Sequence, residues 1–164
     1  MSKIKNTANA VEEKIEINRE QIKHRAAWMG LIYDEMKKAG VDGEAIIRKA
    51  VKRCGTVHGE NFKGKCADPK NCDDFRKVFL GETGIKTFNM KDIYSDKDNV
   101  KVEFQYCALV ESWQKLGFGD EECALLCDMA MEGDRGIAGA MGLKLDLADT
   151  IAGGSNTCKL HFHK

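Results

Sequence analysis

The sequence lacks an excess of charge of either sign. Its 164 residues include 26 Lys and Arg and 26 Asp and Glu, which gives a formal net charge of zero at pH 7. A balanced chain has no overall field to attract a phosphate backbone or an anionic membrane surface. We therefore expect no nucleic acid and no membrane as partner. This expectation leaves a homo-oligomer open.

Long apolar runs are also missing. No stretch reaches the length of a transmembrane helix, and the opening MSKIKNTANAVEEKIE has no apolar core of a secretory signal, so we expect a soluble, cytoplasmic protein. The chain contains no GxGxxG after a predicted strand, no Walker loop, no HExxH and no GxSxG, which removes several enzyme classes. Its length favours one domain over 1–164, with a helical part over 1–60 and the sheet and site-bearing helices over 82–164.

The seven cysteines do not form close CxxC pairs. Structural zinc sites usually take their ligands from such pairs, so the spacing is a weak indication of zinc. An odd number of irregularly spaced cysteines, in a chain expected in the cytoplasm, indicates reduced thiols instead of a disulfide framework. Free cysteine is also a common core residue, so each one has packing as an alternative explanation.

Helical periodicity dominates the first part of the chain. Apolar residues recur at helical intervals over about 8–39, which predicts a long amphipathic helix closed by Gly40. The segment VDGEAIIRKAVKRCG predicts a second helix that ends at Gly55. The polar, glycine-rich stretch from Gly55 to Asn71 contains the only proline, Pro69, and predicts a surface loop.

The remaining chain combines short helices with two hairpins. Asn71 or Asp73 is expected to cap a short helix that ends at Gly81. Alternation in GIKTFNMKDIY and NVKVEFQY predicts one hairpin, and GLKLDLADT with NTCKLHFHK predicts another. Between them lie the helix CALVESWQKLG and a helix capped by Asp120 that runs to about Met131. This order predicts an α+β fold: an N-terminal helical layer on a small antiparallel sheet of two hairpins, with two further helices between them.

Cys107 lies where a strand passes into a helix. Its sulfur is expected to face the free N–H groups at the helix start, a position that lowers a thiol pKa. Glu111, one turn later, shares its face and would hold a proton or a cation. The alternative is that Cys107 is a buried small residue and Glu111 a solvated charge.

Cys127 and Asp134 depend on how far the following helix extends. If it persists, Cys123, Cys127, Met131 and Asp134 share one stripe. A carboxylate on a buried stripe needs a partner or a function. If the helix ends near Glu132, Asp134 is an ordinary loop or cap residue.

The last predicted strand presents two faces. By the two-residue period, Cys158, Leu160 and Phe162 point toward the core or a pocket. His161 and His163 lie on the opposite face and are expected to face solvent, unless another layer covers that face.

The motif order of the C-terminal half resembles the family of L-2-amino-thiazoline-4-carboxylic acid hydrolases. It runs FQYCALVESWQKLGFGDEECALLCDMAMEGDRG, then LADTIAGGSNTCKLHF, and RAAWMGLIYDEMKKAGVDGEAIIRKAVKRCG looks like the family's helical N-terminal half. The family shows a strand ending in Cys, a helix with an aromatic and a Gly, a Cys-bearing helix followed by Asp, and a Thr-hydrophobic-Ala-Gly turn before Cys-x-Phe-x-Phe. The matching residues here are Cys107, Trp113, Gly117, Cys127, Asp134, the turn Thr150-Ile151-Ala152-Gly153, Cys158, Leu160 and Phe162. Two departures are Leu160 in place of the first Phe, and Met131 where many such sequences carry another Cys.

The resemblance implies hydrolytic opening of a cyclic amidine, with attack at the ring carbon between nitrogen and sulfur. The product would be an N-carbamoyl cysteine, which places the reaction in cysteine metabolism. This chemistry needs a nucleophile, a carboxylate for the amidinium, a proton source and a cation for the substrate carboxylate. Cys107 or Cys127 would be the nucleophile or, with Cys158, a ligand of a divalent metal such as zinc. Asp134 and Glu111 would be the base or the amidinium partner.

The remaining assignments concern the substrate. The resemblance implies substrate contacts at Trp113 and Thr150, while Arg135 or Lys144 would meet the substrate carboxylate. The alternative to an enzyme is a non-catalytic small-molecule or metal-binding module. It would use Cys107, Cys127 and Cys158.

Overall fold

The fold is α+β, as the sequence predicts, and its sheet is antiparallel throughout. The computed structural model describes residues 2–164. The helices are α1 (Glu13–Lys38), α2 (Gly43–Lys63), α3 (Cys72–Phe79), α4 (Glu82–Thr87), α5 (Ala108–Lys115), α6 (Asp120–Ala130) and α7 (Glu132–Met141). The strands are β1 (Met90–Ser95), β2 (Asn99–Phe104), β3 (Lys144–Leu147) and β4 (Cys158–His163). Within the described residues, no helix is both long and apolar enough to span a membrane.

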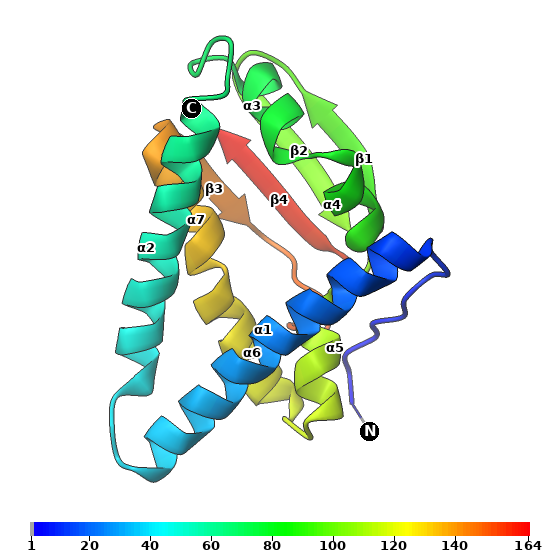
Figure 1. The fold of residues 1–164 in the computed structure, drawn as a ribbon, viewed down its shortest axis with the longest axis vertical. Helices are drawn as coiled ribbons and strands as arrows, with labels where there is room; N and C mark the ends of the chain where they lie inside the picture. Colours follow the sequence, from blue (N-terminus) through cyan, green and yellow to red (C-terminus); the bar gives the residue numbers. More distant parts are fainter. Residues whose placement is uncertain (1) are drawn as a thin grey trace.

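The two long helices form a V at one side of the molecule, with α1 running diagonally across α5 and α6 in the view of Figure 1. Helix α1 begins at Glu13, later than the predicted start near residue 8, because the preceding segment is extended. The buried guanidinium of Arg19 holds that segment by donating to the backbone oxygen of Asn9 at 2.9 Å and to its Oδ1 at 2.7 Å. The chain before α1 is therefore packed along the fold.

The prediction that the second helix ends at Gly55 is wrong, because α2 continues to Lys63. Gly55 lies inside the helix at its contact with α7, where a Cβ atom would sit 1.9 Å from the carbonyl oxygen of Gly133. Gly136 of α7 is equally tight, since its Cβ would lie 2.3 Å from the carbonyl oxygen of Lys52. The glycines thus allow two helix backbones to approach closely. The loop predicted from residue 55 begins only after Lys63.

Both predicted hairpins are present, and they join into one sheet of strand order β1-β2-β4-β3. The pairs Val100↔Phe162 and Val102↔Leu160 bring buried side chains together across β2 and β4. The first strand begins at Met90, because the residues before it, 85–87, belong to α4. The inward orientation predicted for Cys158, Leu160 and Phe162 is confirmed, with exposures of 7%, 2% and 0%.

The short elements are placed largely as predicted. The Asn71 side chain caps α3 by accepting a hydrogen bond from the Asp73 backbone N–H at 3.0 Å. Helix α6 starts one residue after its cap, Gly119, whose N–H donates to the Glu122 carboxylate at 3.1 Å. Asp120, the predicted cap, is instead the first helical residue. Met131 separates α6 from α7, so the alternative of one continuous helix with a single stripe from Cys123 to Asp134 does not hold.

Candidate functional site

Four predicted site residues, each from a different part of the chain, are near neighbours in space. Cys107 follows β2 and is the N-cap residue of α5, Cys127 is in α6, Asp134 is in the first turn of α7, and Cys158 begins β4. Burial raises the pKa of the Cys127 thiol most, and negative charge on any of the other three residues raises it further. Charges have such an effect only at short range in a protein interior. We call these four residues the thiol–carboxylate cluster.

The cluster is surrounded by protein but is not sealed from solvent. Cys107 and Asp134 are half-buried, and Cys127 and Cys158 each keep 7% of their surface exposed. The neighbouring core residues Leu126 and Phe162 have no exposed surface. A small molecule that reached the cluster would therefore first meet Cys107 and Asp134.

Asp134 has the electrostatics of a proton-transfer group. Burial raises the pKa of its carboxyl from the ordinary 3.8 to about 6, while its own backbone N–H, Arg25 and Arg135 act in the opposite direction. A carboxyl with a pKa of about 6 exchanges protons readily near neutral pH, which suits general acid or base catalysis.

The expectation that its place at the helix start gives Cys107 a lowered pKa is wrong. The backbone N–H groups of Val110 and Leu109 do lower the pKa, and so does Arg25, but burial outweighs them and the pKa of the thiol is raised overall. The sulfur forms no capping hydrogen bond with the helix. Cys107 nevertheless has nearby groups that stabilise a thiolate once it forms.

Cys127 and Cys158 have weaker support for a negative charge. The causes resolved for the Cys127 thiol all raise its pKa. Burial raises the pKa of Cys158 to about 12, although the Ile151 backbone N–H donates to its sulfur at 3.2 Å. Thr150 shapes the turn that presents this N–H, because its Oγ1 accepts from the Gly153 backbone N–H at 3.0 Å. Both thiols are therefore neutral at physiological pH.

The three cluster sulfurs do not form a closed metal site. Within residues 2–164, the Sγ atoms of Cys107, Cys127 and Cys158 do not all lie within 4.8 Å of one another. Thiolates around a tetrahedral zinc ion, with Zn–S bonds of about 2.3 Å, are separated by about 3.8 Å. The arrangement fits a carboxyl group among protonated thiols better than it fits a zinc ligand set.

Glu111 lies in a separate ion-pair network. Burial raises its pKa, but Lys115, Tyr106 and Lys23 together lower it to about 2. The Lys23 Nζ atom lies 3.2 Å from its carboxylate, and the Tyr106 hydroxyl donates a short hydrogen bond to it. Glu111 is therefore a fixed anion that links α1 to α5.

Trp113, Arg135 and Lys144 lie outside the cluster. The Trp113 side chain has no exposed surface, and its Nε1 donates to the Ala26 carbonyl oxygen at 2.8 Å. The Arg135 guanidinium pairs with Asp128 at 2.6 Å and with Glu132 at 2.7 Å. Lys144 is the strand neighbour of His163, which lies at the other end of β4 from Cys158. At 3.3 Å per residue, Lys144 is therefore about 17 Å from Cys158.

The sequence offered no indication of two residues that act on the cluster. Arg25 of α1 is exposed, and its charge acts on both Cys107 and Asp134. Asn6 pairs with the backbone of Cys107 through two hydrogen bonds of 2.9 and 2.8 Å. A helical arginine and an asparagine near the N-terminus have no motif spacing that relates them to Cys107, so only the packing of α1 and the N-terminal segment reveals them.

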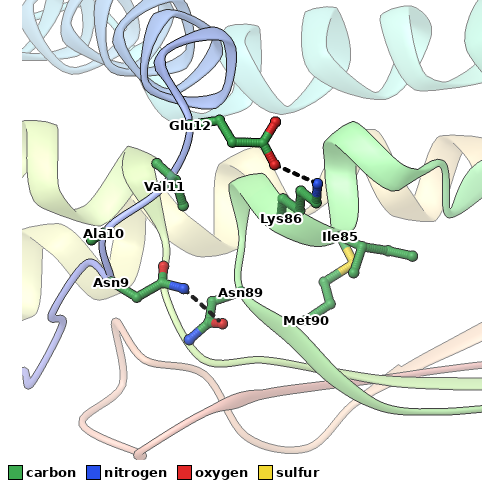
Figure 2. Close-up of a pocket in the computed structure, with 8 residues that line it drawn as sticks. All are labelled: Asn9, Ala10, Val11, Glu12, Ile85, Lys86, Asn89 and Met90. Atoms are coloured by element: carbon green, nitrogen blue, oxygen red, sulfur yellow. Dashed lines mark hydrogen bonds and ion pairs between the residues drawn. The ribbon is translucent and has the colours of Figure 1, made fainter.

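A surface hollow of about 590 Å³ lies elsewhere, between the N-terminal segment and the α4–β1 junction. Figure 2 shows that its polar side chains largely pair with each other: Asn9 Nδ2 donates to Asn89 Oδ1 at 3.3 Å, and Lys86 lies 2.6 Å from the Glu12 carboxylate. Neither a thiol nor a histidine lines it. The hollow therefore lacks the nucleophiles and proton-transfer groups of the cluster.

Comparison with known proteins gives one family. The family model described as L-2-amino-thiazoline-4-carboxylic acid hydrolase matches residues 19–162, a span that includes the whole thiol–carboxylate cluster. No curated protein and no solved structure matches the chain.

Proposed function

This chain belongs to the L-2-amino-thiazoline-4-carboxylic acid hydrolase family, and on that premise we propose that it opens a small cyclic amidine of this type by hydrolysis. The product is an N-carbamoyl cysteine, which contains the atoms of the thiazoline acid plus one water. The main support is Asp134, a carboxyl group with a pKa of about 6 that lies among three thiols and keeps part of its surface exposed.

Cys107 is the proposed nucleophile. Among the three cluster cysteines it is the residue with the most exposed surface. Burial raises the pKa of its thiol, and helix N–H groups together with Arg25 act in the opposite direction, toward the thiolate. Asp134 removes the thiol proton, and the sulfur attacks the ring carbon between nitrogen and sulfur. The ring C–S bond then breaks, and the departing ring sulfur takes the proton from Asp134.

Water completes the reaction. The first step leaves an isothiourea on Cys107, and water adds to its central carbon while Asp134 accepts a proton. The bond between that carbon and the Cys107 sulfur breaks, the sulfur recovers its proton, and the carbon is left as the carbonyl of the N-carbamoyl product. The reaction requires no external oxidant or reductant, and it consumes one water molecule for each ring that is opened.

Arg25 is the proposed partner of the substrate carboxylate. It is exposed and its charge reaches the cluster, whereas Arg135 is occupied by Asp128 and Glu132. Arg25→Gln should raise KM about tenfold or more and change kcat less, because the interaction is the same in the ground state and the transition state.

The test is to incubate the purified chain with 2-amino-thiazoline-4-carboxylate and to quantify N-carbamoyl cysteine by mass spectrometry. Cys107→Ser and Asp134→Asn should each lose at least about a hundredfold in kcat. Cys54→Ser is the matched control, since Cys54 is an exposed thiol on α2 that should not be needed. Wild-type rates in Cys107→Ser would reject the nucleophile, and the absence of product from the wild-type chain would reject the substrate.

A further inference from the structure

A second group of potential ligands lies on the outward face of β3 and β4, where Asp146, His161 and His163 come together. Asp146 is directly opposite His161 in the strand register, and His163 is two residues further along the same face. Asp146 Oδ2 lies 3.1 Å from His163 Nε2 and 3.9 Å from His161 Nδ1. The sequence placed both histidines on this face but did not relate them to Asp146.

Hydrogen bonds at the ring nitrogens that face away from Asp146 orient both imidazole rings. His163 Nδ1 lies 2.8 Å from the backbone oxygen of Lys164, and His161 Nε2 lies 2.8 Å from Asn99 Oδ1. The Asn99 amide is itself oriented, because its Nδ2 group donates to Asp96 at 3.0 Å. Since both partners are oxygen acceptors, each of these ring nitrogens carries the hydrogen. The nitrogens that face Asp146 are then left as lone pairs.

The His163 Nε2 atom has no hydrogen-bond partner although it is buried. Asp146 Oδ2, 3.1 Å away, is an acceptor only, and no hydrogen bond joins the two atoms. A buried lone pair beside a carboxylate oxygen is unfavourable unless a proton or a metal ion lies between them. Metal-binding histidines commonly show this arrangement, with the second nitrogen donating to a carbonyl or carboxylate oxygen.

We propose that Asp146, His161 and His163 form a binding site for a divalent transition-metal ion of the zinc type. Imidazole and carboxylate ligands suit Zn²⁺, Co²⁺, Ni²⁺ and Cu²⁺ better than they suit Mg²⁺ or Ca²⁺. At bond lengths of about 2.05 Å, tetrahedral ligand atoms are about 3.3 Å apart. The 3.1 Å separation already fits, and the 3.9 Å one closes with a small movement of Asp146, whose side chain is 68% exposed.

The surroundings define what such an ion would do. Lys144 is opposite His163 on β3 and Lys101 is opposite His161 on β2, so two cations on this face weaken the site relative to a wholly anionic one. Three protein ligands leave a fourth position for water. The ion would join the four-residue strand β3 to β4, and would therefore stabilise the hairpin whose opposite end carries Cys158.

The test is a titration of the metal-free full-length chain with Co²⁺, followed by competition with Zn²⁺. The wild type should bind one ion without a thiolate-to-cobalt charge-transfer band, and Zn²⁺ should raise its Tm. His161→Asn/His163→Asn should bind at least about tenfold more weakly, while His24→Asn, which changes an exposed histidine on α1, should match the wild type.

A second readout does not depend on these variants. In the wild-type chain, Zn²⁺ should shift the imidazole NMR signals of His161 and His163 and leave those of His24 and His58 in place. Unchanged affinity in a double variant with native circular dichroism would overturn the proposal. So would a thiolate band that accounts for the bound cobalt, or the absence of any shift at excess Zn²⁺.

Discussion

Asn6 and Cys107, 101 positions apart in the sequence, exchange two hydrogen bonds: the Cys107 backbone N–H donates to Asn6 Oδ1 at 2.9 Å, and Asn6 Nδ2 donates to the Cys107 carbonyl oxygen at 2.8 Å. The Asn6 side-chain amide thus satisfies both the N–H and the carbonyl group of Cys107, as the backbone of a neighbouring strand would. The pairing holds the proposed nucleophile at the start of α5.

Asn6→Ala should impair both stability and activity. It leaves the Cys107 N–H and carbonyl without their partners, which should lower the free energy of unfolding by about 1–3 kcal/mol. The turnover of the thiazoline acid should fall by about tenfold or more, because a misplaced nucleophile loses its attack geometry. Urea unfolding and product formation measure the two effects. The exposed Asn61→Ala on α2 serves as control, and an Asn6→Ala enzyme with full activity would show that Cys107 needs no such support.

The close crossing of α2 and α7 predicts opposite effects for two glycine substitutions. In Gly55→Ala the new Cβ would lie 1.9 Å from the Gly133 carbonyl oxygen, so the helices must separate, and we expect a loss of about 3 kcal/mol or more. In Gly139→Ala, also helical, the new Cβ has no neighbour within 4 Å, and we expect a gain of up to about 1 kcal/mol. Thermal unfolding compares them, and equal Tm values would contradict the close approach.

Asp134→Asn should stabilise the fold above neutral pH while it removes activity. Burial raises the pKa of Asp134 from 3.8 to about 6, so the folded chain binds this proton more tightly than the unfolded chain. The associated stability is present below about pH 4 and is lost as the pH rises through 6. The asparagine variant should therefore be more stable than the wild type by about 1–3 kcal/mol at pH 7.5, with no advantage near pH 4. Urea unfolding across this range tests the sign, and a variant that is less stable at pH 7.5 would contradict it.

Glu111→Gln should have the opposite pH dependence. Lys115, Tyr106 and Lys23 hold the Glu111 pKa at about 2, below the ordinary 4.5, despite its burial. The stability from its charge is present above pH 4.5 and is lost as the pH falls toward 2. We expect the variant to lose about 1–3 kcal/mol near pH 7, with a difference that shrinks on acidification. The exposed Glu82→Gln should change stability little at any pH, and a pH-independent loss in Glu111→Gln would indicate packing in place of charge.

Local patterns predicted most of the elements but not the contacts that modify them. The two-residue period oriented Cys158 and Phe162 correctly, because side-chain direction along a strand depends only on neighbouring residues. The end of α2 was misplaced at Gly55, because a glycine at a tight helix crossing resembles a glycine at a helix end until the opposing Gly133 is known. The sequence also could not exclude Lys144 as an anion-binding residue, because only the strand register shows that it lies at the end of β4 away from Cys158.

The sequence by itself determined the α+β class, the two hairpins and the resemblance to a hydrolase family, because periodicity, caps and motif order are recorded locally along the chain. The tertiary structure decided which charged and sulfur-bearing groups act together. Asp134 obtains its pKa of about 6 from burial, and Glu111 its pKa of about 2 from three neighbours, two of them nearby in sequence and one, Lys23, on α1. Desolvation and charge interactions depend on distances in space, so neither value, nor the meeting of Asp146 with His163, follows from residue order alone.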